Sequence, residues 1–207
     1  MIRKILPALV ATGFAAFPLL TRTAQAEDQK APELHIRGTV ETFSPSVLKV
    51  KTREGATVDV ALADGWKIFA VARAQVTDIK PSDFVGIASQ PRAEGGDGAL
   101  EVLIFPPALR GAGEGSYGWD LKPNSSMTNA TVADAVEGVQ GRTVTVSYQG
   151  KQKKIAIPNG TPVVTIASAT KADLATGAVV FIVAEKAASG VLGHQVVVGK
   201  DGVVPPM

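Results

Sequence analysis

The stretch VLKVKTREGATVDVAL, residues 47–62, decides the fold. Apolar and polar residues alternate on both sides of Gly55, a pattern typical of half-buried β-strands. Glycine adopts the positive φ that tight hairpin turns need, so Arg53-Glu54-Gly55 predicts the turn between two strands. The stretch therefore predicts an antiparallel hairpin whose return strand places Val58, Val60 and Leu62 on one face.

Further strands extend this hairpin in both directions. The alternation predicts strands at 39–43, 68–71, 83–89 and 99–105. A single helical turn is expected at 75–80, where Pro81 prevents further growth of a helix. About five strands with one helical turn before the fourth is the arrangement of small OB-type barrels. The fold class expected is therefore mainly all-β.

The same pattern returns 95 residues later in the chain. The corresponding positions are Gly55 and Gly150, Val60 and Ile155, Leu62 and Ile157, Gly65 and Gly160, Asp78-Ile79 and Asp173-Leu174, and Val85 and Val180. One offset that holds across some thirty residues, glycines included, indicates a duplication. It predicts two tandem OB-like β-domains at 34–105 and 131–200. Chance alignment is the alternative, because period-2 patterns are common.

The N-terminus has the order of a secretory signal. Arg3 and Lys4 precede an apolar run from Ile5 to about Leu20, and Ala24-Gln25-Ala26 has the small residues that a signal peptidase needs. This predicts a signal peptide at 1–26 with cleavage after Ala26, and a flexible mature N-terminus at 27–33. The predicted location is the periplasm, or outside the cell. An uncleaved membrane anchor is the alternative.

Composition narrows the possible functions of the mature chain. The sequence has no cysteine, which excludes disulfides, lipid attachment through cysteine and thiolate metal sites. Losing Arg3, Lys4 and Arg22 with the signal leaves 18 basic against 19 acidic residues. Such a chain lacks the positive field that attracts nucleic acid, so no nucleic-acid partner is expected. No second long apolar run predicts a transmembrane segment in the mature chain.

A Gly- and Pro-rich linker at 106–130 joins the two predicted domains, and a C-terminal tail at 201–207 follows the second. Long connections of this kind are usually either functional or disordered. This linker contains apolar side chains that a solvated linker does not need, namely Leu109, Tyr117, Trp119, Leu121 and Met127. We therefore expect it to pack along one or both barrels.

The linker also contains the candidate ligand-binding residues, which are Arg110, Glu114, Tyr117, Trp119 and Asp120. Two carboxylates that flank two aromatic side chains can act as general acid and base, or collect a hard cation. The aromatic rings could stack on a sugar or a peptide. The alternative is that Trp119 anchors the linker to a barrel while the acids stay in water.

No other motif predicts catalysis, and neither a metal site nor a cofactor is expected. The series Gly113-x-Gly115-x-x-Gly118 matches a dinucleotide fingerprint only formally, because no long helix can follow it. His35 and His194 have no neighbours at metal-ligand spacing and are expected to be partly exposed strand residues. Ser116 could pair with His194 in space, although no nucleophile-elbow motif supports that pair.

Several motifs of this region occur in a fixed order. They are Glu101-Val102-Leu103-Ile104-Phe105-Pro106, Leu109-Arg110-Gly111, Gly113-Glu114-Gly115, Trp119-Asp120-Leu121 and Ser126-Met127-Thr128-Asn129-Ala130. Together they resemble a family of small exported bacterial proteins of unknown function, often labelled "metal ABC transporter permease". The resemblance covers nearly the whole mature chain and implies two OB-like β-domains. A permease needs several spanning helices, which this sequence does not predict.

The resemblance fails at two places in the Gly-rich segment. Family members commonly have a histidine where this chain has Ser116, and a proline where it has Gly118. A metal or ligand role of that histidine therefore does not carry over.

These patterns favour a non-catalytic periplasmic binding or interaction module, whose partner is a small ligand or an envelope protein. The alternative is an envelope enzyme with its site at Glu114, Tyr117, Trp119 and Asp120. That alternative expects these side chains to converge on one cleft with a carboxylate of raised pKa. A purely structural subunit of an envelope complex is a third possibility.

Overall fold

The computed structural model describes residues 33–138 and 141–205. These residues form twelve β-strands and three short 3-10 turns, without an α-helix, so the expected all-β class is confirmed. The predicted signal peptide at 1–26 and the segment 27–32 lie outside the described residues. Within the described ranges, no helix has the length and apolar character needed to cross a membrane.

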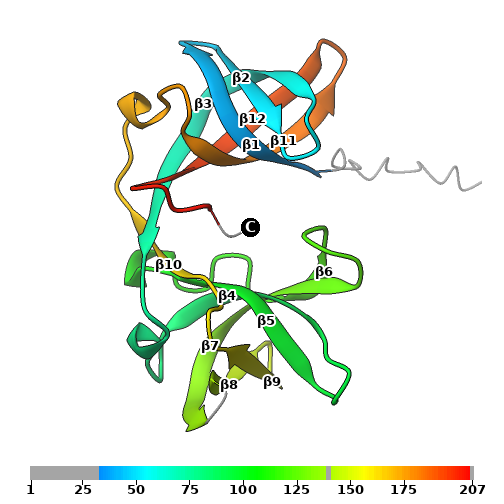
Figure 1. Cartoon of the computed structure of the whole chain (residues 1–207), viewed down its shortest axis with the longest axis vertical. Coiled ribbons are helices and arrows are strands. Elements are labelled where there is room, and N and C mark those ends of the chain that lie inside the picture. Colours follow the sequence, from blue (N-terminus) through cyan, green and yellow to red (C-terminus); the bar gives the residue numbers. More distant parts are fainter. Residues whose placement is uncertain (1–32, 139–140, 206–207) are drawn as a thin grey trace, which may run out of the picture. The chain divides into compact units, whose positions relative to one another are not determined.

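Five strands close into a first barrel (Figure 1). They are β1 (Glu33–Ser44), β2 (Val47–Thr52), β3 (Thr57–Arg73), β11 (Val179–Ala187) and β12 (Gly190–Gly199). Antiparallel pairs join β1 to β2, β2 to β3, β11 to β12 and β11 to β1, and a parallel pair between β12 and β3 closes the ring. The predicted hairpin is present as β2 and β3, and Gly55 has the positive φ expected of its turn.

A second barrel has the same order of strands. Its members are β7 (Ser125–Gly138), β8 (Gly141–Tyr148), β9 (Lys151–Pro158), β4 (Phe84–Pro91) and β5 (Asp97–Ile104). The ring is antiparallel except between β5 and β9, which pair in parallel over two residue pairs. Each barrel has its own apolar core, centred on Leu48 and Ile182 in the first barrel and on Ile87 and Ile155 in the second.

The strand pairing contradicts the prediction that each half of the chain, 34–105 or 131–200, forms its own barrel. The first barrel takes three strands from the first half and two from the second, and the second barrel takes the reverse. Figure 1 shows this exchange as blue and cyan strands beside orange and red ones in the first barrel. The two copies have exchanged their last hairpins.

The physical reason for the exchange is the length of the third strand. β3 runs from Thr57 to Arg73, well beyond the residues that pair with β2, with an irregularity at Gly65 (φ +71°) between its two paired stretches, so the chain leaves the first barrel before its fourth strand. In the second copy, β9 and β10 (Val163–Ala167) correspond to this long strand. β3 and β10 pair antiparallel with Val71 opposite Ile166, two residues that are themselves 95 apart. The copies therefore cross at a local two-fold axis.

Local details of the two copies agree closely. Bulges lie at the equivalent places in the first strands, beside Val40 and Val132. The 3-10 turns η1 (Val76–Asp78) and η3 (Lys171–Asp173) have the same capping box. The residue after each turn, Ile79 or Leu174, is almost fully buried in a barrel core. The spacing of 95 residues therefore corresponds to structural equivalence from the hairpin glycines onward, whereas the bulges of the first strands lie 92 residues apart.

The linker is ordered and shorter than predicted. It contains the turn η2 (Pro107–Leu109) and the strand β6 (Gly115–Trp119), which pairs antiparallel with the start of β7. Residues 125–130 were predicted as linker but belong to β7, because they pair with β4 and extend the second barrel. Trp119 packs, as expected, in a third apolar cluster with Phe181 and Val203, the last of which belongs to the C-terminal tail.

Candidate functional site

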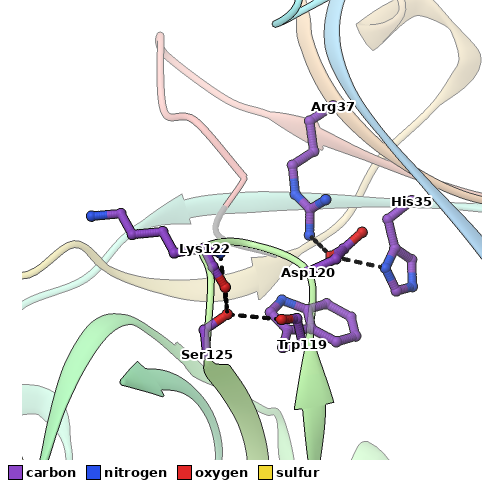
Figure 2. Close-up of polar contacts among 6 residues, drawn as sticks. All are labelled: His35, Arg37, Trp119, Asp120, Lys122 and Ser125. Atoms are coloured by element: carbon purple, nitrogen blue, oxygen red, sulfur yellow. Dashed lines mark hydrogen bonds and ion pairs between the residues drawn. The ribbon is translucent and has the colours of Figure 1, made fainter. Parts of the chain in front are cut away.

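The loop between β6 and β7 fixes the position of Asp120. Ser125 Oγ lies 2.8 Å from the carbonyl oxygens of Trp119 and Lys122, and it accepts a hydrogen bond from the Lys122 N–H at 3.1 Å. Asn124 has φ +59°, a left-handed conformation that asparagine tolerates in turns. This closed loop projects Asp120 toward β1 (Figure 2).

Asp120 contacts two basic side chains of β1. Arg37 donates a hydrogen bond to Asp120 Oδ1 at 2.7 Å, and Nδ1 of His35 lies 3.1 Å from the same oxygen. Burial opposes the ionisation of Asp120, but the hydrogen bond and charge of Arg37, together with His35, lower its pKa. The loop is therefore held to β1 by an ionised carboxylate.

Aromatic rings line the other side of this ion pair. The ring centres of His35 and Trp119 are 4.4 Å apart, and that of Phe181 lies 5.4 Å from His35. The Arg37 guanidinium lies 5.1 Å from the centre of Phe181 and 5.9 Å from that of Trp119. Such cation–π contacts stabilise the charge of the Arg37 guanidinium, whose side chain is only 8% exposed.

The structure brings together three of the five predicted site residues. Tyr117, Trp119 and Asp120 lie in sequence along β6 and its loop, and the ring centres of Tyr117 and Trp119 are 6.3 Å apart. Arg110 instead donates to the Ser82 carbonyl at 2.7 Å. Glu114 accepts a hydrogen bond from the Gln149 backbone N–H at 2.8 Å, so it fastens the β8–β9 turn.

The buried carboxylate of the site is Glu101 in β5, a residue that is not among the five predicted from the sequence. Glu101 is 8% exposed, and its Oε1 has no hydrogen-bond partner among the described residues. Burial raises its pKa to about 8, although the charges of Arg37 and Arg53 act in the opposite direction. At neutral pH most Glu101 side chains therefore carry a proton that they can donate.

Glu101 lies where several cavities meet. One cavity of about 440 Å³, which we call the basic cavity, is lined by Arg37, Lys51, Arg53 and Glu101, and by apolar residues that include Leu121, Val180 and Pro205. A smaller cavity of about 90 Å³ also contains Trp119, whose buried Nε1 has no hydrogen-bond partner among the described residues. The basic cavity has the size and mixed lining of a small-molecule site.

A second polar cluster fills one end of the second barrel. Lys153 forms an ion pair with Asp97 at 2.6 Å and lies 3.1 Å from Ser126 Oγ and 3.4 Å from Thr128 Oγ1. Ser89 Oγ lies 3.4 Å from Ser126 Oγ. The equivalent positions of the first barrel, given by its strand register, are all apolar: Leu34, Ile36, Val58, Ala184 and Val191.

The remaining candidates make separate contacts. Ser116 Oγ lies 3.0 Å from Thr128 Oγ1, whereas His194 Nε2 lies 3.2 Å from Glu185, so each member of the considered Ser–His pair has another partner. The His35 side chain on β1 is 13% exposed, and Trp119 and Asp120 cover part of it. Within residues 33–138 and 141–205, no group of three or more histidines and acids could hold a metal ion.

Sequence reasoning missed Glu101, Arg37, Lys51 and Arg53. One signal was present for Glu101, because it interrupts the otherwise apolar run Ala99–Phe105. A bulge in the pairing of β4 with β5 turns Glu101 to the face that carries Leu103, away from the core residue Val102. The three basic residues gave no signal, since exposed lysines and arginines are common on strands.

No family model matches the chain, and no curated protein or solved structure shows significant similarity to it.

Proposed function

We propose that the chain is an exported, non-catalytic binding module built on two OB-like barrels, and that its ligand is a small amphipathic carboxylate. The export signal predicted at 1–26 supports the location in the periplasm or outside the cell. The order of strands within each ring supports the OB-like assignment, since OB folds are five-stranded Greek-key barrels.

One observation carries the proposal: a buried, protonatable carboxyl group shares a cavity of about 440 Å³ with three basic side chains. Arginine guanidinium groups match the geometry of a carboxylate. A protonated Glu101 donates an O–H···O⁻ hydrogen bond, which is among the stronger hydrogen bonds of proteins. Leu121, Val204 and Pro205 offer apolar contact to the rest of the ligand.

Glutarate and benzoate are suitable probes for the basic cavity, with their amides as neutral twins. We expect calorimetric titration at pH 6.5 to detect both acids and to detect the amides at least about tenfold more weakly, because the amides lack the charge. Equal affinity for acids and amides, or binding of neither, would refute the proposal.

Replacing Arg53 with glutamine should weaken glutarate binding by about tenfold or more, because one charge-assisted hydrogen bond contributes roughly 1.5–3 kcal/mol. Arg53 lines the basic cavity, whereas Arg110 does not. R110Q is therefore the matched control and should bind glutarate like the unchanged protein. If R53Q and R110Q behave alike in the titration, the ligand does not enter this cavity.

A further inference from the structure

The first part of β1 has an open edge. Residues 33–39 of β1 pair with β11 on one side, but β2 pairs with β1 only from Gly38 onward. On the β2 side, no described strand pairs with residues 33–36. The Val40 N–H donates a hydrogen bond to the Ala178 carbonyl, on the β11 side of β1. The Arg37 carbonyl accepts a hydrogen bond from the Arg53 N–H, on the opposite side. Because strand residues alternate, the N–H and C=O of His35 also point to the open edge.

In the second copy of the repeat, a β-strand covers the equivalent edge. Residues 125–129 of β7 are equivalent to residues 33–37 of β1, since the bulges at Val132 and Val40 align. In the second copy, β6 covers this edge and pairs along its whole length, with Tyr117 opposite Met127. Met127 corresponds to His35. An extended strand therefore fits this geometry.

A cavity follows the open edge and leads to the basic cavity. Its volume is about 310 Å³, and its lining includes His35, Ile36, Thr52 and Glu54. It shares Arg37, Thr52 and Arg53 with the basic cavity. A strand that pairs with β1 can thus place a side chain toward the three basic residues and Glu101.

We propose that the open edge of β1 docks an extended segment of another polypeptide, and that an acidic side chain of this segment enters the basic cavity. This inference rests on the proposed function, because it assigns the carboxylate to a peptide. Main-chain hydrogen bonds to His35 give affinity, and the cavity selects the acidic side chain, as in other cases of β-strand addition.

The test uses the full mature chain and three capped seven-residue peptides of alternating threonine and valine. One peptide has a central glutamate, its twin has glutamine there, and a third has the glutamate but is N-methylated at every backbone amide, which blocks both of its edges. Amide hydrogen exchange at His35 and Met127 is followed by NMR. Before any peptide is added, His35 should exchange at least about tenfold faster than Met127, whose edge β6 covers.

The glutamate peptide should slow exchange at His35 by about tenfold or more and leave Met127 unchanged. The glutamine twin should need about tenfold higher concentration, and the methylated peptide should have no effect, because it cannot pair with the strand. Exchange at His35 as slow as at Met127 in the free protein would overturn the proposal. So would unchanged exchange with the glutamate peptide while glutarate still binds, an outcome that leaves the proposed function standing. If glutarate also fails to bind, both fall.

Discussion

Replacing Lys153 with methionine should lower the free energy of unfolding by about 3 kcal/mol, because it leaves Asp97 without its cation in a mostly covered site. Both side chains of this pair are only about one-fifth exposed, and Ser126 and Thr128 would lose the same donor. Urea unfolding at pH 7 measures the change. A loss below about 1 kcal/mol would show that water, rather than the barrel, surrounds the pair.

The pair Lys49–Asp59 provides the matched control. Its 2.7 Å contact resembles that of Lys153 with Asp97, but its side chains are 40% and 60% exposed. K49M should therefore leave the free energy of unfolding nearly unchanged. The double variant K153V/D97V, which copies Val58 and Val191 of the first barrel, should recover most of the stability lost in K153M.

This cluster also explains which hairpin enters which barrel. The β4–β5 hairpin contributes Ser89 and Asp97, and the β7–β9 sheet contributes the side chains that complement them. Without the exchange, Asp97 would face Val58 and Lys153 would face Val191, so both charges would be buried without partners. Charges buried without partners are strongly unfavourable. The K153V/D97V variant should consequently show a second set of strand pairings by NMR.

Replacing Glu101 with glutamine should make the protein more stable than the unchanged chain at alkaline pH. The carboxyl group keeps its proton in the folded state up to a pKa of about 8, whereas an unfolded chain releases it near the ordinary value of 4.5. The folded state therefore binds more protons between these values, and stability falls as pH rises through that window. The loss should reach roughly 3–5 kcal/mol by pH 9.

Unfolding of E101Q and the unchanged protein at pH 4.5, 7 and 9 isolates this effect. The difference between the two should be small at pH 4.5, grow through neutral pH and level off above pH 8. E137Q is the control, because the Glu137 side chain is 64% exposed beside Arg142. A constant difference between E101Q and the unchanged protein would mean that Glu101 ionises normally in the folded state.

Local features were predictable from the sequence wherever a short pattern determines them. The hairpin turn at Gly55, the turn before Ile79 and the alternation around Val60 follow from glycine conformation, proline and period-2 burial. The repeat of 95 residues was likewise visible, because both copies need the same turns and core positions. Trp119 was predicted to pack because a solvated linker does not need a large aromatic ring.

The exchange of hairpins was not predictable from these patterns, because a strand has the same alternation whichever sheet it joins. The Asp97–Lys153 pair distinguishes the two arrangements, but it is recognised only once the strands are in register. The site was hidden for the same reason. Glu101 and Arg37 both belong to the first half of the chain but to different barrels, and only the folded structure brings them to one cavity.

Hα–Hα NOEs from the unchanged monomer test the exchange most directly. Thr39 lies opposite Val179, and Phe84 lies opposite Thr131. The next residues along the strands, Val40 and Val132, donate the cross-strand hydrogen bonds. Both pairs therefore occupy non-hydrogen-bonded positions, where the two α-carbons are closest. We expect strong NOEs between Thr39 and Val179 and between Phe84 and Thr131. Strong NOEs that instead join Thr39 to Phe84 and Thr131 to Val179 would contradict the exchanged barrels.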